Sequence, residues 1–374
     1  LTDVAGLGPF VLTEHVSGQR LVFQRNPRYF RHDAAGVQLP YLDSLTLAIV
    51  ADQGAEALRL QAGEIDLMAN GDIRPQDYAG FKGLADKGSL RLIDAGVGLD
   101  PDFLWFNLTP ARQASSSAPW LFQREFRQAM SYAVDRQAIV NAVYLGAAVP
   151  IFGPVSPGNL RWHSAAAPRY AFDQAKARQL LAAAGLADRN GDGILDDRRG
   201  TPVRFSVLTQ AGHVRGRAAE VIQAQLRQVG IAVDLVTLDP GGIFQRWQKG
   251  DYDAIYFGLQ ASSTDPALNL DFWLSSGSGH FWNPSQASPS PAWEKRIDDL
   301  MHEQASTADL AARQRAFAEV QRIMGEELPA IYFVAPKVTI ATSMRVRNAT
   351  PAPQAPQLLW SVDTLAAAGA GGSR

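Results

Sequence analysis

The chain has 374 residues, which is more than one compact core usually holds, so its length predicts two lobes or domains. Basic and acidic residues nearly balance, 35 against 37, which excludes the concentrated positive charge of a general nucleic-acid-binding protein. Cysteine is absent, and this excludes disulfides, zinc–thiolate sites, iron–sulfur clusters and thiol nucleophiles. The longest apolar stretches, such as Leu45–Ala51, are far shorter than the roughly 20 residues of a membrane-spanning helix.

Short apolar runs separated by turn residues fill the first hundred residues, and this pattern predicts strands with one short helix. The predicted strands are Phe10–His15, Arg20–Arg25, Leu45–Val50, Asp66–Met68 and Phe103–Asn107. Between the first two strands, Val16-Ser17-Gly18-Gln19 is typical of a hairpin turn. Ala55–Gln61 predicts a helix that ends at Gly63.

After the Ser-rich loop Ser115–Ser117, helical and strand patterns alternate, which predicts an α/β layer architecture. The predicted helices are Leu121–Tyr144, Phe172–Ala184, Ala218–Val229, Ala292–Glu303 and Ala308–Glu327. The predicted strands are Pro202–Leu208, Ile231–Leu238, Tyr252–Leu259 and Pro329–Pro336. Residues 366–374, rich in Ala, Gly and Ser, are expected to form a disordered tail.

Known catalytic motifs are missing from the sequence. No two of the 6 histidines have the spacing of a zinc-protease helix, and there is neither a phosphate-binding Gly-Lys-Ser/Thr loop nor a Gly-x-Ser-x-Gly elbow. Gly6-Leu7-Gly8-Pro9 precedes a strand rather than a helix, so it is not a dinucleotide-binding loop. We therefore expect a protein that is not an enzyme. The alternative is a hydrolase that uses scattered carboxylates such as Asp265 and Asp271.

One segment, Asp188–Asp196, has much of the spacing of a calcium-binding loop, with Gly193 at its sharp turn. The candidate oxygen ligands are Asp188, Asn190, Asp192, Asp196 and the carbonyl of Ile194. Arg199 stands where such a loop has its bidentate Glu. The segment is therefore either a weak structural calcium site or a tight Asn-Gly or Asp-Gly turn. If calcium binds, a calcium-dependent adhesion module is a further alternative, and no other cofactor is expected.

Aromatic residues in loops are candidates for a ligand site. Trp273, Phe281 and Trp282 lie in sequence rich in Ser, Gly, Asn and Pro, and loop aromatics stack on ligands at a low entropic cost. Anchoring of the loop explains the same residues equally well.

Several further motifs follow one another along the chain. They are Gly6-Leu7-Gly8-Pro9-Phe10, Arg25-Asn26-Pro27-Arg28-Tyr29, Pro40-Tyr41-Leu42-Asp43, Leu60–Asp66, Phe126–Arg136, Lys176–Leu186, Val229-Gly230-Ile231, Asn283-Pro284 and Pro329-Ala330-Ile331. In this order they resemble the solute-binding proteins of the peptide/nickel class (family 5) of ABC importers. Each motif alone is weak, but the ordered set is highly specific.

The resemblance implies a two-lobed α/β fold of the periplasmic-binding-protein type (class II), with a ligand enclosed between the lobes. It implies hinge crossings at Phe103–Leu108 and Ile331–Ala335, which should lie side by side as strands. Lobe I would then comprise residues 1–108 and 334–365, and lobe II residues 109–333. Family members usually carry a long segment ahead of the Gly6–Phe10 motif, so lobe I is expected to be incomplete at its N-terminus.

Gly258–Pro266 departs from the pattern of the family's peptide binders. Where those proteins have a Gly-Trp step and then an Asp that pairs with the peptide's α-ammonium, this chain has Leu259 and Ser262, whereas Asp265-Pro266 matches a second Asp-Pro step. A buried ammonium group needs a charged partner. The resemblance therefore implies a non-peptide solute, or a peptide held by its backbone and carboxylate rather than by its amine.

The remaining implications concern other ligand contacts and partners. The candidate ligand-binding residues are Trp105, Asn107, His213, Arg215, Arg217, Ser262, Asp265, Trp273 and Trp282. The two arginines precede the predicted helix Ala218–Val229, where they would favour an anionic or carboxylate-bearing ligand, although exposed arginines are common at helix starts. The expected partners are a small solute, peptide or other, and the membrane permease of an ABC importer, with no nucleic acid. We expect a monomer in the periplasm or another extracytoplasmic space, with a lipid anchor ahead of Leu1 as one option.

Overall fold

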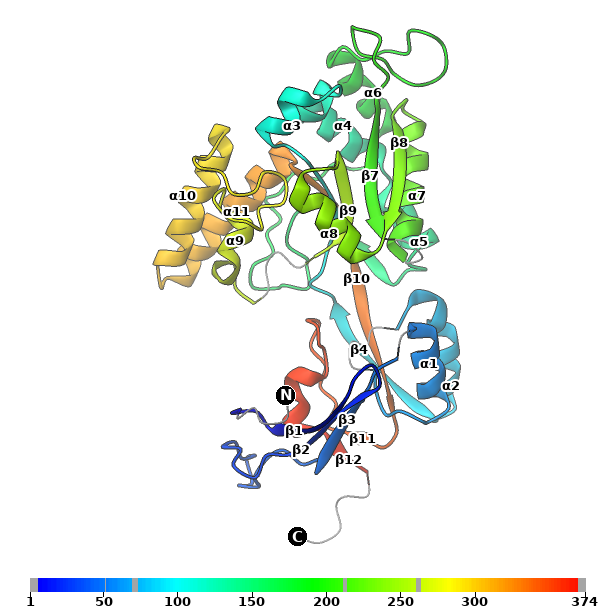
Figure 1. The fold of residues 1–374 in the computed structure, drawn as a ribbon, viewed down its shortest axis with the longest axis vertical. Helices are drawn as coiled ribbons and strands as arrows, with labels where there is room; N and C mark the ends of the chain where they lie inside the picture. Colours follow the sequence, from blue (N-terminus) through cyan, green and yellow to red (C-terminus); the bar gives the residue numbers. More distant parts are fainter. Residues whose placement is uncertain (1–5, 51, 69–72, 211–213, 260–263, 369–374) are drawn as a thin grey trace. The chain divides into compact units, whose positions relative to one another are not determined.

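The computed structural model describes residues 6–50, 52–68, 73–210, 214–259 and 264–368 (Figure 1). The chain divides into two units: unit 1 comprises Leu1–Gly96 and Lys337–Arg374, and unit 2 comprises Val97–Pro336. These limits differ from the boundaries expected after residues 108 and 333. The chain enters unit 2 earlier, at Val97, and leaves it later, after Pro336.

Unit 1 begins with an antiparallel sheet in the order β1-β2-β3, formed by β1 (Phe10–Val16), β2 (Arg20–Arg25) and β3 (Ser44–Ala48). The predicted hairpin is confirmed, because β1 pairs with β2 along its length. Gly18 in the connecting turn has a φ of +69°, a conformation that residues with a side chain rarely adopt.

A helical layer follows in unit 1. It contains α1 (Gln53–Gln61), the 3-10 turn η1 (Pro75–Asp77) and α2 (Tyr78–Asp86), and it leads into the strand β4 (Leu90–Val97). The Asp52 side chain caps α1 by accepting a hydrogen bond from the Ala55 amide. The sequence analysis did not predict α2 or β4. The predicted strand Asp66–Met68 is wrong, because Leu67 makes only an isolated bridge to Thr342.

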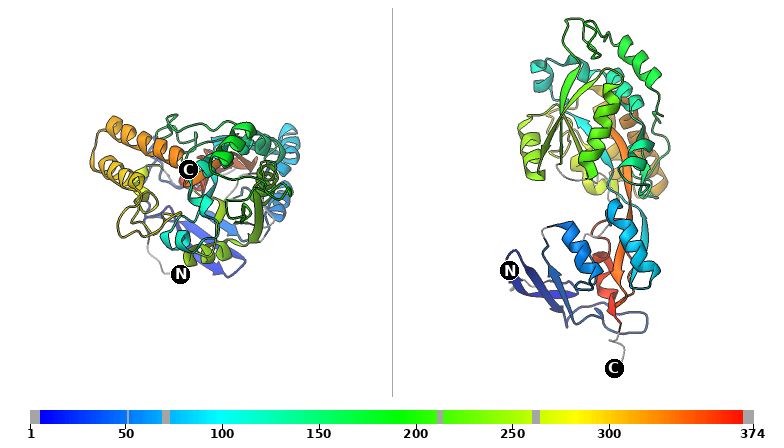
Figure 2. Two further views of the ribbon diagram at one scale, coloured as in Figure 1. Left: turned by 90° about the horizontal axis from the view of Figure 1, so that it is seen from above. Right: turned by 90° about the vertical axis from the view of Figure 1, so that its right-hand side faces the viewer.

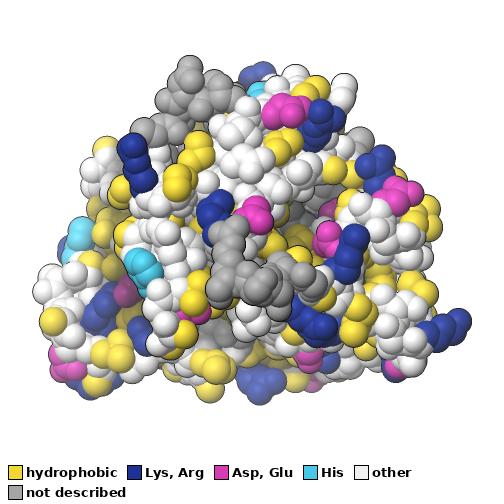
Figure 3. Space-filling view, turned by 90° about the horizontal axis from the view of Figure 1, so that it is seen from below, with side chains coloured by type: hydrophobic (Ala, Val, Ile, Leu, Met, Phe, Trp, Pro, Cys, Tyr) yellow, Lys and Arg dark blue, Asp and Glu magenta, His cyan; other side chains and the backbone are white. Residues whose placement is uncertain are grey.

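The end of the chain returns to unit 1 through η4 (Leu359–Thr364) and a small ladder of β11 (Val346–Arg347) with β12 (Ala366–Ala367). The expected disorder from residue 366 is therefore wrong for Ala366 and Ala367, and residues 369–374 lie outside the described part of the chain. Basic and acidic side chains are interspersed on the face drawn in Figure 3, as the near balance of charges predicts.

The largest sheet is mixed and has the order β4-β10-β5-β9-β7-β8, with β6 (Ala148–Pro150) paired to β10; β5, β6, β7, β8 and β9 lie in unit 2. The other strands are β5 (Asp102–Phe106), β7 (Arg204–Gln210), β8 (Ala232–Leu238), β9 (Ala254–Gly258) and β10 (Ala330–Ser343). β7 runs parallel to β8 and β9, whereas β5 is antiparallel to β9 and β10.

The pairing of β5 with β10 confirms that Phe103–Leu108 and Ile331–Ala335 supply neighbouring strands, with Ile331 opposite Leu104. The expectation that these segments are the crossings between the lobes is wrong for both, since residues 103–108 and 331–335 lie wholly within unit 2. The strands with residues in both units are β10 and, through its last residue, β4.

Helices cover both faces of the unit 2 sheet (Figures 1 and 2). Val207 of β7 belongs to one apolar cluster with the helix α7 (Val214–Arg227), while Leu208 belongs to another with the helix α8 (Pro240–Lys249). Because successive side chains of a strand point to opposite faces, α7 and α8 lie on opposite sides of the sheet.

The remaining helical segments of unit 2 precede β7 or follow β9. The first group is α3 (Pro110–Ser115), η2 (Pro119–Phe122), α4 (Arg124–Ala133), α5 (Arg136–Ala142) and α6 (Gln174–Ala183). The second group is η3 (Pro266–Asn269), α9 (Leu270–Trp273), α10 (Ala292–Ser306) and α11 (Leu310–Glu327). Figure 1 shows α10 beside α11, and the two helices share an apolar cluster.

The single helix predicted over Leu121–Tyr144 is wrong, because the chain breaks between α4 and α5. In a continuous helix the Asp135 amide would donate a hydrogen bond to the Ser131 carbonyl. At the break, the Asp135 amide donates to the Gln225 side chain, and the Ser131 carbonyl accepts a hydrogen bond from the Arg136 guanidinium. The Asp135 side chain then caps α5 by accepting hydrogen bonds from the next turn. Periodicity alone does not reveal the break because the apolar spacing continues through it.

Arg136 is buried, and no carboxylate in the described part of the chain pairs with it. Its guanidinium donates to the carbonyls of Ser131, Ile151 and Tyr332 at 2.8–3.0 Å and lies over the rings of Phe152 and Phe333. Burial lowers the pKa of Arg136 to about 9. These contacts tie the α4–α5 junction to the ends of β6 and β10.

Replacing this buried side chain tests that role. We expect Arg136→Met to lower the free energy of unfolding by about 3 kcal/mol or more, because several buried carbonyls lose their donors. The measurement is urea-induced unfolding of the full chain followed by circular dichroism. Arg169→Met is the matched control, since exposed Arg169 also lies over Phe152, at 5.0 Å. An equal loss in both variants would contradict the structural role of Arg136.

Candidate functional site

The parallel strands of unit 2 end at one edge of the sheet, where β7 ends at Gln210, β8 at Leu238 and β9 at Gly258. Ligands of open α/β sheets bind outside the carboxyl ends of parallel strands. β5 runs the opposite way, so its first residue, Asp102, pairs with Gly258 at this edge. We refer to this region as the carboxyl edge.

An ion pair is held at the carboxyl edge. The Asp102 side chain is almost fully buried, and its Oδ1 accepts a hydrogen bond from Arg215 Nε at 2.7 Å. Its Oδ2 accepts another from the Tyr144 hydroxyl. Burial alone would lower the pKa of Arg215, but the Asp102 carboxylate raises it above its ordinary value. Burial, together with Asp102, raises the pKa of Tyr144. The pair is therefore charge-neutral as a unit.

Gly258 is required by this arrangement. A Cβ atom at position 258 would collide with the Arg215 guanidinium and with the Asp102 carboxylate. The guanidinium also lies over the ring of Phe257 at 5.0 Å from its centroid. Arg215 is thus fixed between the ends of β5 and β9 and retains a partly exposed side chain, 28% of it accessible.

The sequence-based placement of the arginines needs correction. Arg215 and Arg217 were expected in a loop before the helix, but α7 begins at Val214 and includes both. Arg217 is exposed to solvent, as arginines at the start of a helix commonly are. Arg215, in contrast, reaches Asp102 at the carboxyl edge. His213 and Ser262 lie outside the described residues.

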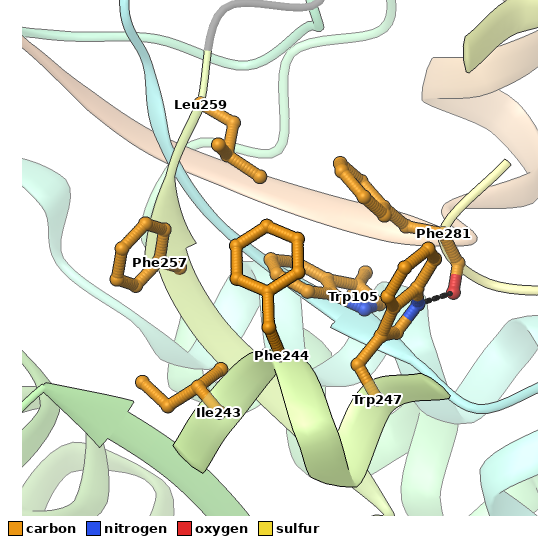
Figure 4. Close-up of a pocket in the computed structure, with 7 residues that line it drawn as sticks. All are labelled: Trp105, Ile243, Phe244, Trp247, Phe257, Leu259 and Phe281. Atoms are coloured by element: carbon orange, nitrogen blue, oxygen red, sulfur yellow. Dashed lines mark hydrogen bonds between the residues drawn. The ribbon is translucent and has the colours of Figure 1, made fainter. Parts of the chain in front are cut away.

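Figure 4 shows an apolar pocket, and one of its lining residues, Phe257, contacts the Arg215 guanidinium. Its lining comes from β5, from α8, from the end of β9 and from the segment after α9, and includes no charged side chain among the residues that the structure describes. The lining residues are Trp105, Ile243, Phe244, Trp247, Phe257, Leu259 and Phe281. Trp247 Nε1 donates a hydrogen bond to the Phe281 carbonyl at 3.0 Å, which fixes α8 to that segment. Of the ligand-site candidates that lie within the described residues, Trp105 and Phe281 line this pocket.

The sequence analysis missed most of this pocket because it missed α8. Asp239 caps the helix by accepting a hydrogen bond from the Gly242 amide, and Pro240 occupies the first turn. That Asp-Pro step, followed by Ile243 and Trp247 four residues apart, was the available signal of a helix start.

Asn107 has a structural role rather than the predicted contact with a ligand. Its side-chain amide donates to the carbonyls of Gly250 and Tyr252, and its Oδ1 accepts from the Thr109 hydroxyl. The residue is buried, and these bonds hold the end of β5 against the turn before β9. A solute would have to break them to reach the amide.

Asp265 is also committed to the protein. Its Oδ1 accepts hydrogen bonds from the Arg313 guanidinium at 2.5 Å and from the Ala267 amide at the start of η3. Burial alone would raise the pKa of Asp265, but the hydrogen bonds from Arg313 and Ala267 lower it below the ordinary value. Asp265 therefore holds η3 against α11, and the expectation that it contacts the ligand is not supported by its geometry.

Trp273 and Trp282 were predicted as cleft aromatics, and the structure contradicts this. Both are buried in the apolar cluster that α10 and α11 cover. Trp282 Nε1 donates to Glu294 at 2.8 Å, and the buried His280 lies 2.9 Å from the other carboxylate oxygen. Loop anchoring, the second explanation of these residues, is the correct one.

The predicted calcium loop forms a tight turn. Asp188 accepts hydrogen bonds from the amides of Gly191 and Gly193, and Asp192 accepts one from the Ile194 amide. Asn190 accepts one from the Asp192 amide, and Asp196 one from the Arg189 amide. In the described part of the chain, no group of three or more His, Cys, Asp or Glu side chains is placed to hold a metal ion.

The Asp265–Arg313 ion pair makes the stability of unit 2 depend on pH. The folded state favours the carboxylate form of Asp265. The contribution of the ion pair to the free energy of unfolding is therefore complete above the ordinary Asp pKa of 3.8 and is lost as the pH falls through the lowered value.

We expect Asp265→Asn to reduce the fall in the free energy of unfolding at acid pH, as measured by unfolding the full chain over a series of pH values. Arg313→Met should reduce this pH dependence equally, and combining the two substitutions should reduce it no further. If the free energy of unfolding of these variants falls with pH as it does for the unmodified chain, the assignment is wrong.

Within the described residues, no helix is long and apolar enough to cross a membrane. The sequence pattern of the bacterial extracellular solute-binding proteins, family 5 Middle, matches residues 1–281. A probable ABC transporter-binding protein of Deinococcus radiodurans is 30% identical over 372 residues, covering 94% of this chain and 61% of the relative. The chain thus spans about three fifths of that relative's length.

Solved structures agree with this match. The oligopeptide-binding protein AppA of Bacillus subtilis, solved with a nonapeptide, has a TM-score of 0.74 at 25% identity, covering 96% of this chain and 66% of AppA. The periplasmic binding protein MelB of Agrobacterium fabrum, solved with stachyose, shares the fold with a TM-score of 0.79 at 23% identity, covering 98% of this chain and 58% of MelB. The predicted two-lobed α/β fold class is confirmed, and the chain belongs to family 5 of the bacterial extracellular solute-binding proteins.

Proposed function

We propose that the protein is an extracytoplasmic solute receptor of an ABC importer, which binds a small solute at the carboxyl edge of unit 2 and delivers it to a membrane permease. The family match over residues 1–281 carries this proposal. The geometry supports it, because a fixed hydrogen-bond donor, Arg215, lies beside an apolar pocket at the edge where α/β sheets bind ligands.

The two alternatives have less support. A hydrolase would need free carboxylates, but Asp265 is paired with Arg313, and Asp271 accepts hydrogen bonds from Ser278 and Gly279. An adhesion module would need a preformed calcium centre, whereas the side chains of Asp188 and Asp192 accept hydrogen bonds from backbone amides of their own loop. The relatives are solute-binding proteins, and this favours the receptor over both alternatives.

The charges at the carboxyl edge bear on the kind of solute. Asp102, at this edge, and Asp265, at the start of η3, are each paired with an arginine, and the family resemblance places the uncharged Ser262 where peptide binders have their ammonium-binding Asp. A protonated amine buried beside neutral groups loses its hydration without a charged partner in return. We therefore propose a solute held without an ammonium clamp, with Arg215 donating to an acceptor oxygen of the solute.

Mass spectrometry of small molecules that co-purify with the full chain tests the receptor proposal. A stoichiometric solute that exchanges without being chemically altered supports it. Turnover of the solute on incubation would contradict it.

Peptides with free and acetylated N-termini test the absence of an amine clamp. We expect the dissociation constants of any peptides that bind to change little on acetylation, because Ser262 gives the ammonium only a neutral partner. Calorimetry with di-, tri- and pentapeptides is the measurement, and Ser262→Asp is the gain-of-function control, which should introduce a preference for the free amine. Tight binding of free peptides that disappears on acetylation would show that the proposal is wrong.

We also propose that the loop Asp188–Asp196 binds calcium weakly, as its oxygen spacing suggests. Calcium would have to displace the backbone amides that now occupy Asp188 and Asp192, so binding should be in the millimolar range. Calorimetry on chelator-treated protein should show heat that Asp188→Asn abolishes. If millimolar calcium produces no heat, the turn is the loop's only role.

A further inference from the structure

We infer that the carboxyl edge selects solutes with an aromatic or branched apolar group, which would rest against Phe244, Phe257 and Leu259. This inference rests on the proposed receptor function and adds the chemical class of the group that is recognised. It starts from apolar side chains of the pocket lining that remain partly exposed to solvent.

Phe244 is the clearest of these side chains. Ile243, its neighbour on α8, is buried and anchors the helix to the sheet, whereas Phe244 is 41% exposed and stands outside the apolar cluster beneath it. Phe257 and Leu259 are only partly buried at the end of β9. All three line the same pocket, and exposed apolar side chains at a pocket mark a place where a ligand binds.

The aromatic wall behind this surface is already rigid. The Phe281 ring stacks on Trp105 with centroids 5.0 Å apart and meets Trp247 edge-to-face at 5.2 Å. The Phe281 carbonyl accepts hydrogen bonds from Trp247 Nε1 and from the Tyr252 hydroxyl, each at 3.0 Å. A wall fixed in advance loses little conformational entropy when a solute binds to it.

The polar groups around the pocket restrict which chemical groups the solute can carry next to its apolar group. None of the seven lining side chains is charged, and the Trp247 donor is occupied by the Phe281 carbonyl. Arg215 lies over the ring of Phe257, at the border of the pocket, with its charge balanced by Asp102. The complementary solute therefore carries an apolar group next to an acceptor oxygen, such as a carbonyl or carboxylate.

Three neutral probes that differ in one side chain test this inference: N-acetylglycinamide, N-acetylleucinamide and N-acetylphenylalaninamide. All have carbonyl oxygens and none has an amine. By calorimetry on the full chain, we expect the phenylalanine probe to bind at least about tenfold more tightly than the glycine probe, with leucine between them. Phe244→Ser should remove most of that difference.

Phe172→Ser is the matched control, because Phe172 is 49% exposed and lies outside the pocket. It should leave the order of the three probes unchanged. Leu259→Trp, which places a larger side chain in the pocket, should weaken the phenylalanine probe but not the glycine probe. Equal affinity for all three probes, no binding of the phenylalanine probe, or equal losses in the Phe244 and Phe172 variants would each overturn the inference.

The co-purifying solute separates this inference from the receptor proposal. A polar solute without an apolar group, bound equally by the unmodified chain and by Phe244→Ser, would overturn the inference and leave the receptor standing. Chemical turnover of that solute would contradict the receptor proposal, regardless of the affinities of the three probes.

Discussion

The buried guanidinium of Arg136 joins three segments of unit 2, one of which, β10, is distant in sequence. A buried cation without a carboxylate partner is costly unless its donors are satisfied, and here backbone carbonyls satisfy them. Ser131 lies in α4, Ile151 follows β6, and Tyr332 lies in β10, so a single side chain fixes where the α4–α5 junction meets two strands. The interruption of the helix at Asp135 is a consequence of this contact, since the carbonyl of Ser131 serves the guanidinium instead of the helix.

The carboxyl edge depends on that fixed position through the register of the sheet. With β10 in place, β5 pairs with it and with β9, and Asp102 comes to stand opposite Gly258. A slip of one residue would turn every side chain of β5 to the other face and remove the carboxylate from Arg215. The glycine completes the arrangement, because the space that its Cβ would need is filled by the ion pair. The site is thus a product of strand register more than of any single loop.

Local patterns predicted the features whose causes are local. The hairpin at Gly18 follows from turn chemistry, and the pairing of β5 with β10 agrees with two apolar runs that bracket the helical segment. The break before Arg136 and the burial of Trp282 were mispredicted for one reason: each depends on a partner distant in sequence or in another element, Tyr332 for the guanidinium and Glu294 for the indole. A loop rich in Ser and Gly resembles an exposed cleft until the helices that cover it are known.

In the receptor that we propose, pairing of the acidic groups would favour apolar contacts over ammonium binding at the carboxyl edge. For Asp265 to hold an amine it would have to leave Arg313, whose guanidinium is only 19% exposed and would then lack its carboxylate partner. Removing one member of a largely buried pair costs more than the new contact returns, so the pair opposes ammonium binding even without steric exclusion. The same reasoning applies to Asp102 and Arg215. Affinity of the proposed site would then come from groups that need no counter-charge, and Phe244, at 41%, is the most exposed of the side chains that line the pocket.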